Sequence, residues 1–215
     1  ALAREAVRES LVLLKNDGGA LPLKRGKRIL VVGKNADNMA NQTGGWSLTW
    51  QGNENKNSEF PNADTILAGI VDAAGKDKVT FSATGADVDV SQFDVVVAVI
   101  GETPYAEGAG DIGPSGTLRH SGRYPEDLAV LERVAGKGKP VVTVLVSGRP
   151  VYANDLMNLS DSFVMAWLPG TEGKGVADVL FKSGGQDFSG KLSFSWPKSV
   201  CQTVLNQGDK DYAPM

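Results

Sequence analysis

The sequence contains one cysteine and one histidine, which excludes two kinds of site from the start. Cys201 has no second cysteine with which to form an internal disulfide, and one cysteine with one histidine cannot build a zinc-type ligand cluster. We interpret Cys201 as a small, partly buried hydrophobic residue near the C-terminus. We expect neither a metal ion nor another cofactor.

Long apolar runs and an excess of basic charge are also lacking. The longest continuous apolar stretches hold about six residues, whereas a membrane-spanning helix needs ~20. The net charge is −3, and no run of Lys and Arg marks a surface for a polyanion. We therefore expect neither a membrane nor a nucleic acid among the partners. No signal peptide is visible in the sequence.

The chain has 215 residues, of which 41% are hydrophobic, and this is enough for one domain with its own core. Its first residues already follow a helical pattern, so we expect further sequence to precede Ala1. Residues 1–215 are interpreted as a single domain of a larger enzyme. The apolar face of this first helix is formed by Ala3, Val7, Leu11 and Leu14, and the helix is expected to end at residues 16–19.

Short apolar runs alternate with helical patterns along the rest of the chain. This alternation predicts an α/β fold, a layered sandwich with a mostly parallel five- or six-stranded sheet and helices on both faces. Residues 191–196 alternate in polarity and are expected to form a final edge strand. The apolar runs lie at residues 28–33, 78–81, 93–100, 141–146 and 162–167, and the helical patterns at 64–74, 125–135 and 172–181.

Two glycine-rich loops carry the residues with chemical potential. Trp46 and Trp50 lie in GGWSLTWQG, and indole faces stack well on the C–H faces of sugars. Glu102, Glu107 and Asp111 follow a predicted strand, and ligands of open α/β sheets gather at the carboxyl ends of strands. A glutamate in a water-poor cleft between aromatic rings has its neutral form favoured, which suits a general acid.

Simpler interpretations of these loops stay open. The three carboxylates are equally compatible with solvated loop charges, and one or both tryptophans with anchors that hold the loop on the core. Trp46 is the better candidate for such an anchor. We expect Trp167 and Trp196, near the ends of predicted strands, to have packing roles.

Two further features of the sequence are given less weight. Residues 108–113 (GAGDIG) match the dinucleotide-binding fingerprint, but they start well after the strand and run into Pro114-Ser115-Gly116 instead of a helix. His120 is interpreted as a surface loop residue, with a contact to a sugar hydroxyl as the alternative.

Six segments occur in an order that resembles a known family. The resemblance is to the second domain of family 3 glycoside hydrolases, above all to exo-acting β-glucan glucohydrolases and β-glucosidases. It extends from residue 3 to about residue 213. The segments are AREAVRESLVLLKNDGGALPL, GGWSLTWQG, GETPYAEGAGD, LVSGRP, AWLPGTEGKGVADVLF and GKLSFSW.

The resemblance implies an active site shared by two domains. A (β/α)8-type barrel, absent from this chain, supplies the aspartate nucleophile, and the second domain supplies the acid/base residue, which corresponds to Glu107. Trp46 and Trp50 correspond to aromatic walls of the substrate slot, and Trp50 to the wall that stacks on the leaving-group sugar. Glu102 is expected to be structural or to support the site from behind, and Asp111 matches an aspartate that is not the nucleophile.

The sequence thus predicts the acid/base-supplying domain of a retaining exo-β-glucosidase or exo-β-glucanase. Its substrates are expected to be β-glucans and β-linked gluco-oligosaccharides, from whose non-reducing ends it releases glucose. The isolated chain is expected to be inactive, and the resemblance implies a secreted or periplasmic location. The alternatives are a non-catalytic carbohydrate-binding domain with an aromatic sugar slot, and a dinucleotide- or flavodoxin-like domain.

Overall fold

A six-stranded sheet forms the centre of the computed structural model, which describes residues 1–113 and 116–215. The strand order is β1-β6-β5-β4-β2-β3. Strand β1 runs antiparallel to β6, and the other neighbours are parallel. The strands are β1 (Val12–Asn16), β2 (Ile29–Val32), β3 (Val79–Ser82), β4 (Val95–Gly101), β5 (Val141–Val146) and β6 (Ser162–Trp167).

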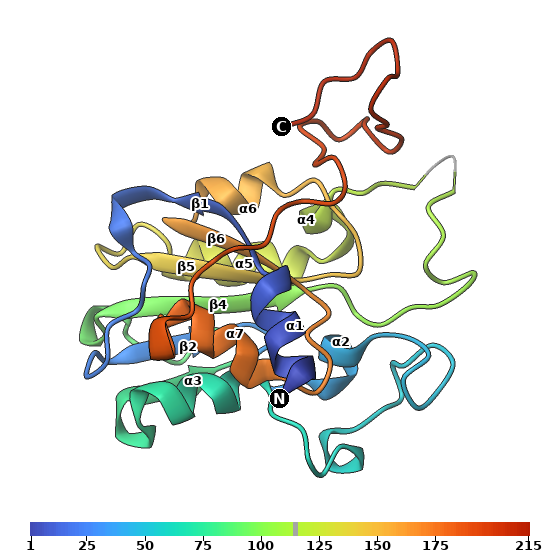
Figure 1. Cartoon of the computed structure of the whole chain (residues 1–215). Coiled ribbons are helices and arrows are strands. Elements are labelled where there is room, and N and C mark those ends of the chain that lie inside the picture. Colours follow the sequence, from blue (N-terminus) through green and yellow to red (C-terminus); the bar gives the residue numbers. More distant parts are fainter. Residues whose placement is uncertain (114–115) are drawn as a thin grey trace.

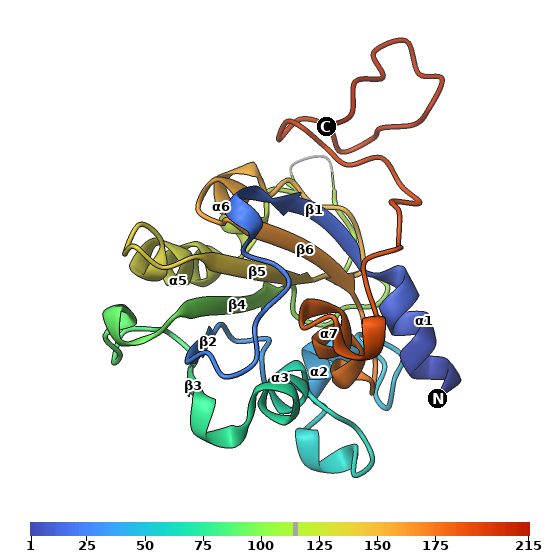
Figure 2. The same ribbon diagram turned by 60° about the vertical axis from the view of Figure 1, so that its left-hand side comes forward.

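Helices cover both faces of this sheet. One layer contains α1, α3 and α7, and the other contains α5 and α6, as Figures 1 and 2 show from two sides. The helices are α1 (Leu2–Ser10), α2 (Met39–Thr43), α3 (Ile66–Ala74), α4 (His120–Arg123), α5 (Pro125–Val134), α6 (Asn154–Asn158) and α7 (Gly173–Leu180).

The side chains of the central strands divide between two cores. In β4, Val97 and Val99 pack with α3 and α7, while Val96, Ala98 and Ile100 pack with α5 and α6. Because successive side chains of a strand point to opposite faces, a strand covered on both sides must be apolar throughout. The predicted α/β sandwich with a mostly parallel sheet is therefore confirmed, and the number of strands is six.

Two elements differ from the sequence-based prediction. The first helix ends at Ser10, and the apolar residues that follow it form β1 along the outer edge of β6. Residues 191–196 form no strand. The helix ends because Leu11 has an extended backbone (φ −63°, ψ 131°), which leads directly into β1. The later segment bends at Ser193 and Phe194, so it does not stay extended long enough to form a strand.

After α7 the chain crosses the α1 side of the molecule, and its last residues extend away from the body (Figures 1 and 2). Among the described residues, no helix has both the length and the apolar composition needed to span a bilayer. The Pro114-Ser115 step, which argued against a dinucleotide-binding helix, lies outside the described residues.

Candidate functional site

The two glycine-rich loops leave the sheet from neighbouring strands. Strand β2 leads into α2 and the tryptophan loop (residues 44–52), and β4 leads into the acid loop (residues 102–111). In the sheet order, the chain moves from β2 outward to β3 and then back across to β4, so the carboxyl ends of β2 and β4 flank a topological switch point. This is where ligands of open α/β sheets bind.

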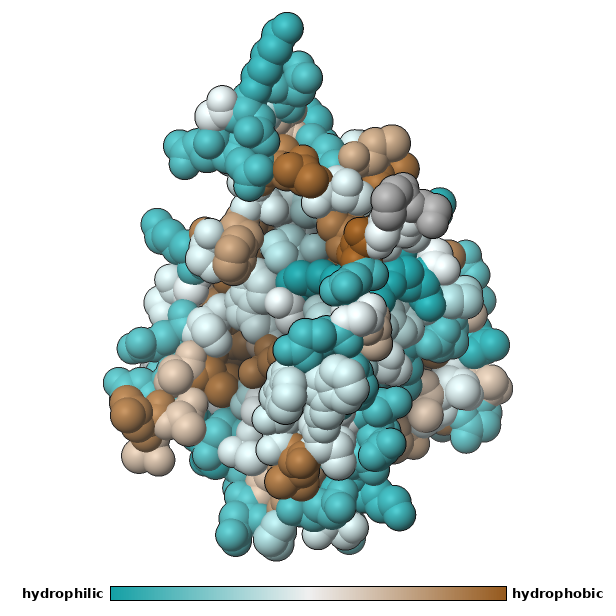
Figure 3. Space-filling view, turned by 90° about the vertical axis from the view of Figure 1, so that its right-hand side faces the viewer, coloured by the Kyte–Doolittle hydropathy of each residue, from teal (hydrophilic) through white to brown (hydrophobic). Residues whose placement is uncertain are grey.

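Both loops project on the side of the molecule that faces the viewer in Figure 3. Hydrophobic side chains on this face form small groups separated by hydrophilic ones. The nearby pocket of about 190 Å³ is lined by Gly44, Gly45, Tyr105 and neighbouring residues but not by Glu107. Glu107 itself is exposed and lies outside this pocket.

Glycines give the tryptophan loop its shape. Gly44 ends α2 with φ at +76°, and Gly52 closes the loop with φ at +84°, a conformation that glycine adopts without strain. The backbone N–H of Trp46 donates to the carbonyl of Trp50 over 2.9 Å. This bond brings the two indoles to one side, with ring centroids 6.2 Å apart and planes tilted by 48°.

The two indoles converge on the carboxylate of Glu107. Trp50 Nε1 donates to Oε2 over 2.6 Å, and Trp46 Nε1 donates to Oε1 over 3.3 Å. The rings themselves are 68% exposed for Trp46 and 55% for Trp50, so neither indole anchors the loop in the core. Three residues predicted from the sequence to act together thus meet at one point.

The protonation state of Glu107 differs from the sequence-based expectation. The carboxyl is exposed, and its pKa is lowered, chiefly by the hydrogen bond from Trp50, with smaller contributions from a backbone N–H and from Trp46. Donors aimed at a carboxylate favour its ionised form. The expectation of a neutral carboxyl between aromatic rings was therefore wrong for this chain, because the indoles present their N–H edges and not their apolar faces to Glu107.

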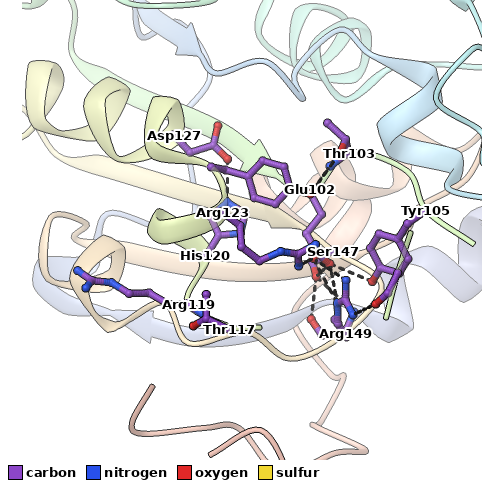
Figure 4. Close-up of polar contacts among 12 residues, drawn as sticks. Glu102, Thr103, Tyr105, Thr117, Arg119, His120, Arg123, Asp127, Ser147 and Arg149 are labelled. Atoms are coloured by element: carbon purple, nitrogen blue, oxygen red, sulfur yellow. Dashed lines mark hydrogen bonds and ion pairs between the residues drawn. The ribbon is translucent and has the colours of Figure 1, made fainter. Parts of the chain in front are cut away.

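Glu102 occupies a different environment, shown in Figure 4. It is 3% exposed, and its carboxylate pairs with Arg123 and with Arg149, the latter at 3.1 Å between Nη2 and Oε1. Ser147 and Tyr105 donate their hydroxyls to Oε2 over 2.7 and 3.0 Å. Glu102 is thus a buried carboxylate with a structural environment at the start of the acid loop, directly after β4.

The charge of Glu102 is maintained by these partners. Burial alone would raise its pKa, but the hydrogen bond from Ser147 and the two guanidinium groups outweigh burial and lower the pKa. The same burial, together with the neighbouring carboxylate, raises the pKa of Tyr105. Both groups therefore keep their ordinary charge states at neutral pH, with Glu102 ionised and Tyr105 neutral.

Asp111 is the last residue of the acid loop and lies at the surface, where its backbone N–H donates to the carbonyl of Gly108 over 3.2 Å. It is neither beside the indoles in the way Glu107 is nor buried in the way Glu102 is. Within the part of the chain that the structure describes, no three His, Cys, Asp or Glu side chains gather as a metal site would require.

Three other sequence-based interpretations are decided by burial. His120 was expected at the surface, but it is fully buried and shares a 2.7 Å hydrogen bond with Asp127, because α4 packs against α5. Cys201 was expected to be partly buried, but it is exposed. The packing roles of Trp196, which is 1% exposed, and of Trp167, whose indole donates to Ser10, are confirmed.

Two residues that shape the site were missed. The Gln51 side chain bridges the tryptophan loop to the backbone of Ala106 and Glu107. Arg149 pairs with Glu102, donates to the carbonyl of Gly110 over 2.6 Å and lies 4.1 Å from the ring centroid of Tyr105. Both residues belong to motifs that were noted whole, GGWSLTWQG and LVSGRP, but an uncharged amide and a lone arginine carry no catalytic signal by themselves.

The fold and these loops define an α/β sandwich domain that presents two indoles and a carboxylate at a sheet switch point. Comparison with known proteins places it more narrowly. The model of the glycosyl hydrolase family 3 C-terminal domain matches residues 11–214. The chain therefore belongs to this family.

Three relatives illustrate the similarity. A crystal structure of an exo-1,3/1,4-beta-glucanase from a Pseudoalteromonas species is 49% identical, with a TM-score of 0.92 over 100% of this chain and 27% of that chain. A lysosomal beta glucosidase of Dictyostelium discoideum is 35% identical over 91% of this chain and 25% of its own length. A periplasmic beta-glucosidase of Salmonella typhimurium is 34% identical over 93% and 29%. The chain thus spans between a quarter and a third of these relatives.

Proposed function

We propose that this chain supplies the acid/base residue, Glu107, of a retaining exo-β-glucosidase or exo-β-glucanase. The observation that carries the proposal is the convergence of the Trp46 and Trp50 indoles on the Glu107 carboxylate, at an exposed switch point of the sheet. The names of the relatives, beta-glucosidases and an exo-glucanase, support β-linked gluco-oligosaccharides and β-glucans as the substrate class.

In this reaction Glu107 has two tasks. Its carboxyl protonates the glycosidic oxygen as the leaving sugar departs, and its carboxylate then removes a proton from the water that releases glucose. The indole faces of Trp46 and Trp50 provide the flat apolar walls on which sugar rings stack, with Trp50 on the leaving-group side.

The first task requires a protonated carboxyl, so the observed hydrogen bonds have to change when substrate binds. A sugar ring stacked on Trp50 would turn the indole edge away from Oε2 and shield the carboxyl from water. Both changes favour the neutral form of Glu107 and raise its pKa. The ionised, doubly hydrogen-bonded state seen here then corresponds to the resting enzyme.

The nucleophile is proposed to lie outside this chain. A retaining mechanism needs a second carboxylate about 5–5.5 Å from the acid/base carboxyl. Glu102 is buried against Arg123 and Arg149 and is not free to attack a substrate. Since the chain spans only 25% to 29% of its curated relatives, a preceding barrel domain is the proposed source of this carboxylate.

Substitution of Glu107 by Gln in the intact enzyme tests this assignment. We expect kcat for an unactivated β-glucoside to fall by about 10²- to 10⁴-fold, while azide restores turnover of a 2,4-dinitrophenyl β-glucoside, whose leaving group needs no acid. The matched control is Glu132→Gln on the exposed face of α5, with unchanged kinetics. Weakened oligosaccharide binding in Glu107→Gln without loss of kcat would instead support a carbohydrate-binding domain.

The isolated 215-residue chain gives a second test. Without a nucleophile it should not hydrolyse a fluorogenic β-glucoside above the rate of the buffer, and robust turnover would contradict the shared active site. A secreted or periplasmic location is part of the same proposal, supported by the relatives named as periplasmic and lysosomal enzymes.

A further inference from the structure

The side-chain amide of Gln51 forms two hydrogen bonds with the backbone that carries Glu107. Its Oε1 accepts from the N–H of Ala106 over 2.7 Å, and its Nε2 donates to the carbonyl of Glu107 over 3.1 Å. The amide thus bridges two consecutive residues of the turn, and both of its polar ends are used.

Glu107 depends on this support because its own side chain is exposed and has no buried anchor. The remaining backbone bonds of the turn are internal to the loop: Gly110 N–H donates to Ala106 over 2.9 Å, and Ala109 N–H donates to Glu107 over 3.0 Å. They fix the shape of the turn but not its distance from the indoles. Gln51 is the residue that sets this distance from the tryptophan side.

The position of Gln51 in the chain strengthens the connection. It directly follows Trp50, whose indole donates to the Glu107 carboxylate over 2.6 Å. Two consecutive residues therefore hold Glu107 at its backbone and at its carboxylate. On the other side of the loop, Arg149 donates to the carbonyl of Gly110 over 2.6 Å, so the turn is held between the tryptophan loop and the segment that follows β5.

We propose that Gln51 is a positioning residue for Glu107, fixing the carboxyl at the distance from Trp50 at which proton transfer to a bound glycoside is efficient. The expected effect on the reaction rate rests on the proposed function, but the effect of Gln51 on the position of Glu107 can be tested in this chain alone. A displacement of about 1 Å in a reacting group can lower a rate by about a hundredfold.

The first experiment measures the geometry without any activity. Gln51→Met keeps the side-chain volume and removes both hydrogen bonds, and Gln51→Asn keeps an uncharged amide but shortens its reach by one methylene group. We expect the pH titration of tryptophan fluorescence, taken as the difference from Glu107→Gln, to move to higher pH in both variants, because a displaced Glu107 loses the indole donors that stabilise its ionised form. Melting temperatures should stay close to that of the unmodified chain, and unchanged titrations in both variants would overturn the proposal.

The second experiment uses the intact enzyme. For laminaribiose we expect kcat of Gln51→Met to fall by about 10- to 100-fold, with KM changed by less than about threefold. The loss should shrink for a 2,4-dinitrophenyl glucoside, and Gln186→Met, in the turn after α7, should have no effect. An unchanged kcat in Gln51→Met would overturn the positioning role. If the unmodified enzyme showed no turnover, the proposed function would be overturned, and the fluorescence titration alone would then test whether Gln51 positions Glu107.

Discussion

The Trp50 indole donates a 2.6 Å hydrogen bond to the carboxylate of Glu107, across two loops that begin on neighbouring strands. Trp46 donates to the other carboxylate oxygen over a longer distance of 3.3 Å. The carboxylate therefore orients both rings, and the two N–H donors in turn lower its pKa. Two exposed indoles and one titrating carboxyl group are thus coupled in one unit.

Replacing Trp50 by Phe should raise the pKa of Glu107. The variant keeps an aromatic face but removes the N–H donor that stabilises the ionised carboxylate, so the neutral form gains relative weight. Trp46→Phe should cause a smaller rise because its hydrogen bond is longer. The measurement is a ¹³C NMR titration of the Glu107 carboxyl carbon.

The control for this titration is Trp167→Phe, which removes an indole N–H that donates to Ser10. It should leave the Glu107 titration unchanged. If all three tryptophan variants shifted the titration equally, the effect would not come from the direct hydrogen bonds.

Glu102→Gln should destabilise the domain by about 3 kcal/mol at pH 7, because two guanidinium groups lose their buried partner. Urea denaturation of the variant and the unmodified chain measures this difference. A loss of stability below about 0.5 kcal/mol would contradict this prediction, because it would show that water solvates the two arginine side chains well enough to replace Glu102.

The ion pairs of Glu102 with Arg123 and Arg149 also predict that the stability of the domain depends on pH. Since folding lowers the pKa of Glu102, its ionisation stabilises the folded state above the unfolded-state pKa, about 4.3. This contribution is lost as the pH falls through the lower, folded-state pKa. The difference in stability between Glu102→Gln and the unmodified chain should therefore shrink below about pH 4, and a difference that stays constant down to pH 2 would contradict the assignment.

Gly45→Ala should separate the two loops. A Cβ at this position would overlap the carbonyl oxygen of Tyr105 and lie 2.9 Å from its carbonyl carbon, so the backbone itself must move. We expect a lower melting temperature and a tryptophan fluorescence titration like that of Glu107→Gln. Gly122→Ala is the control, since a Cβ there meets only the Arg119 side chain at 3.9 Å.

Arg149→Lys should loosen the acid loop despite conserving the charge. A lysine cannot pair with Glu102 through two nitrogens while donating to Gly110 and lying flat on the Tyr105 ring. Hydrogen exchange of the amides in residues 103–111 should become faster by about tenfold or more. A tenfold increase corresponds to a free energy of local opening that is lower by ~1.4 kcal/mol. Arg119→Lys, at an exposed pair with Asp155, should change stability by about 0.5 kcal/mol or less and leave this exchange unchanged.

Much of the fold could be predicted because its strands are buried on both faces. Short runs rich in valine, such as residues 95–100 and 141–146, are typical of strands in a parallel sheet that is covered on both faces. Strand β1 was not predicted because its apolar residues also continue the spacing of the preceding helix. Its partner β6 lies near the other end of the chain, and local periodicity contains no information about such pairing.

The sequence singled out three residues that the structure brings together, but it did not predict the electrostatics of their contact. Trp46, Trp50 and Glu107 are recognisable as residue types in glycine-rich loops, and the strand order brings them together. Which edge of an indole faces a carboxylate depends on side-chain torsions, which sequence spacing does not determine. The roles of Gln51 and Arg149 depend on contacts with backbone atoms, and these are invisible until both loops are placed.

The tight join between β4 and β5 has a consequence for how such domains can vary. A side chain at Gly101 would overlap the carbonyl oxygen of Val146, and Glu102 follows at once. Adding or deleting a single residue within β4 would shift Glu102 by about 3.3 Å and turn it to the opposite face. Such a change would separate Glu102 from Arg123 and Arg149, so engineered grafts should leave the length of β4 unchanged.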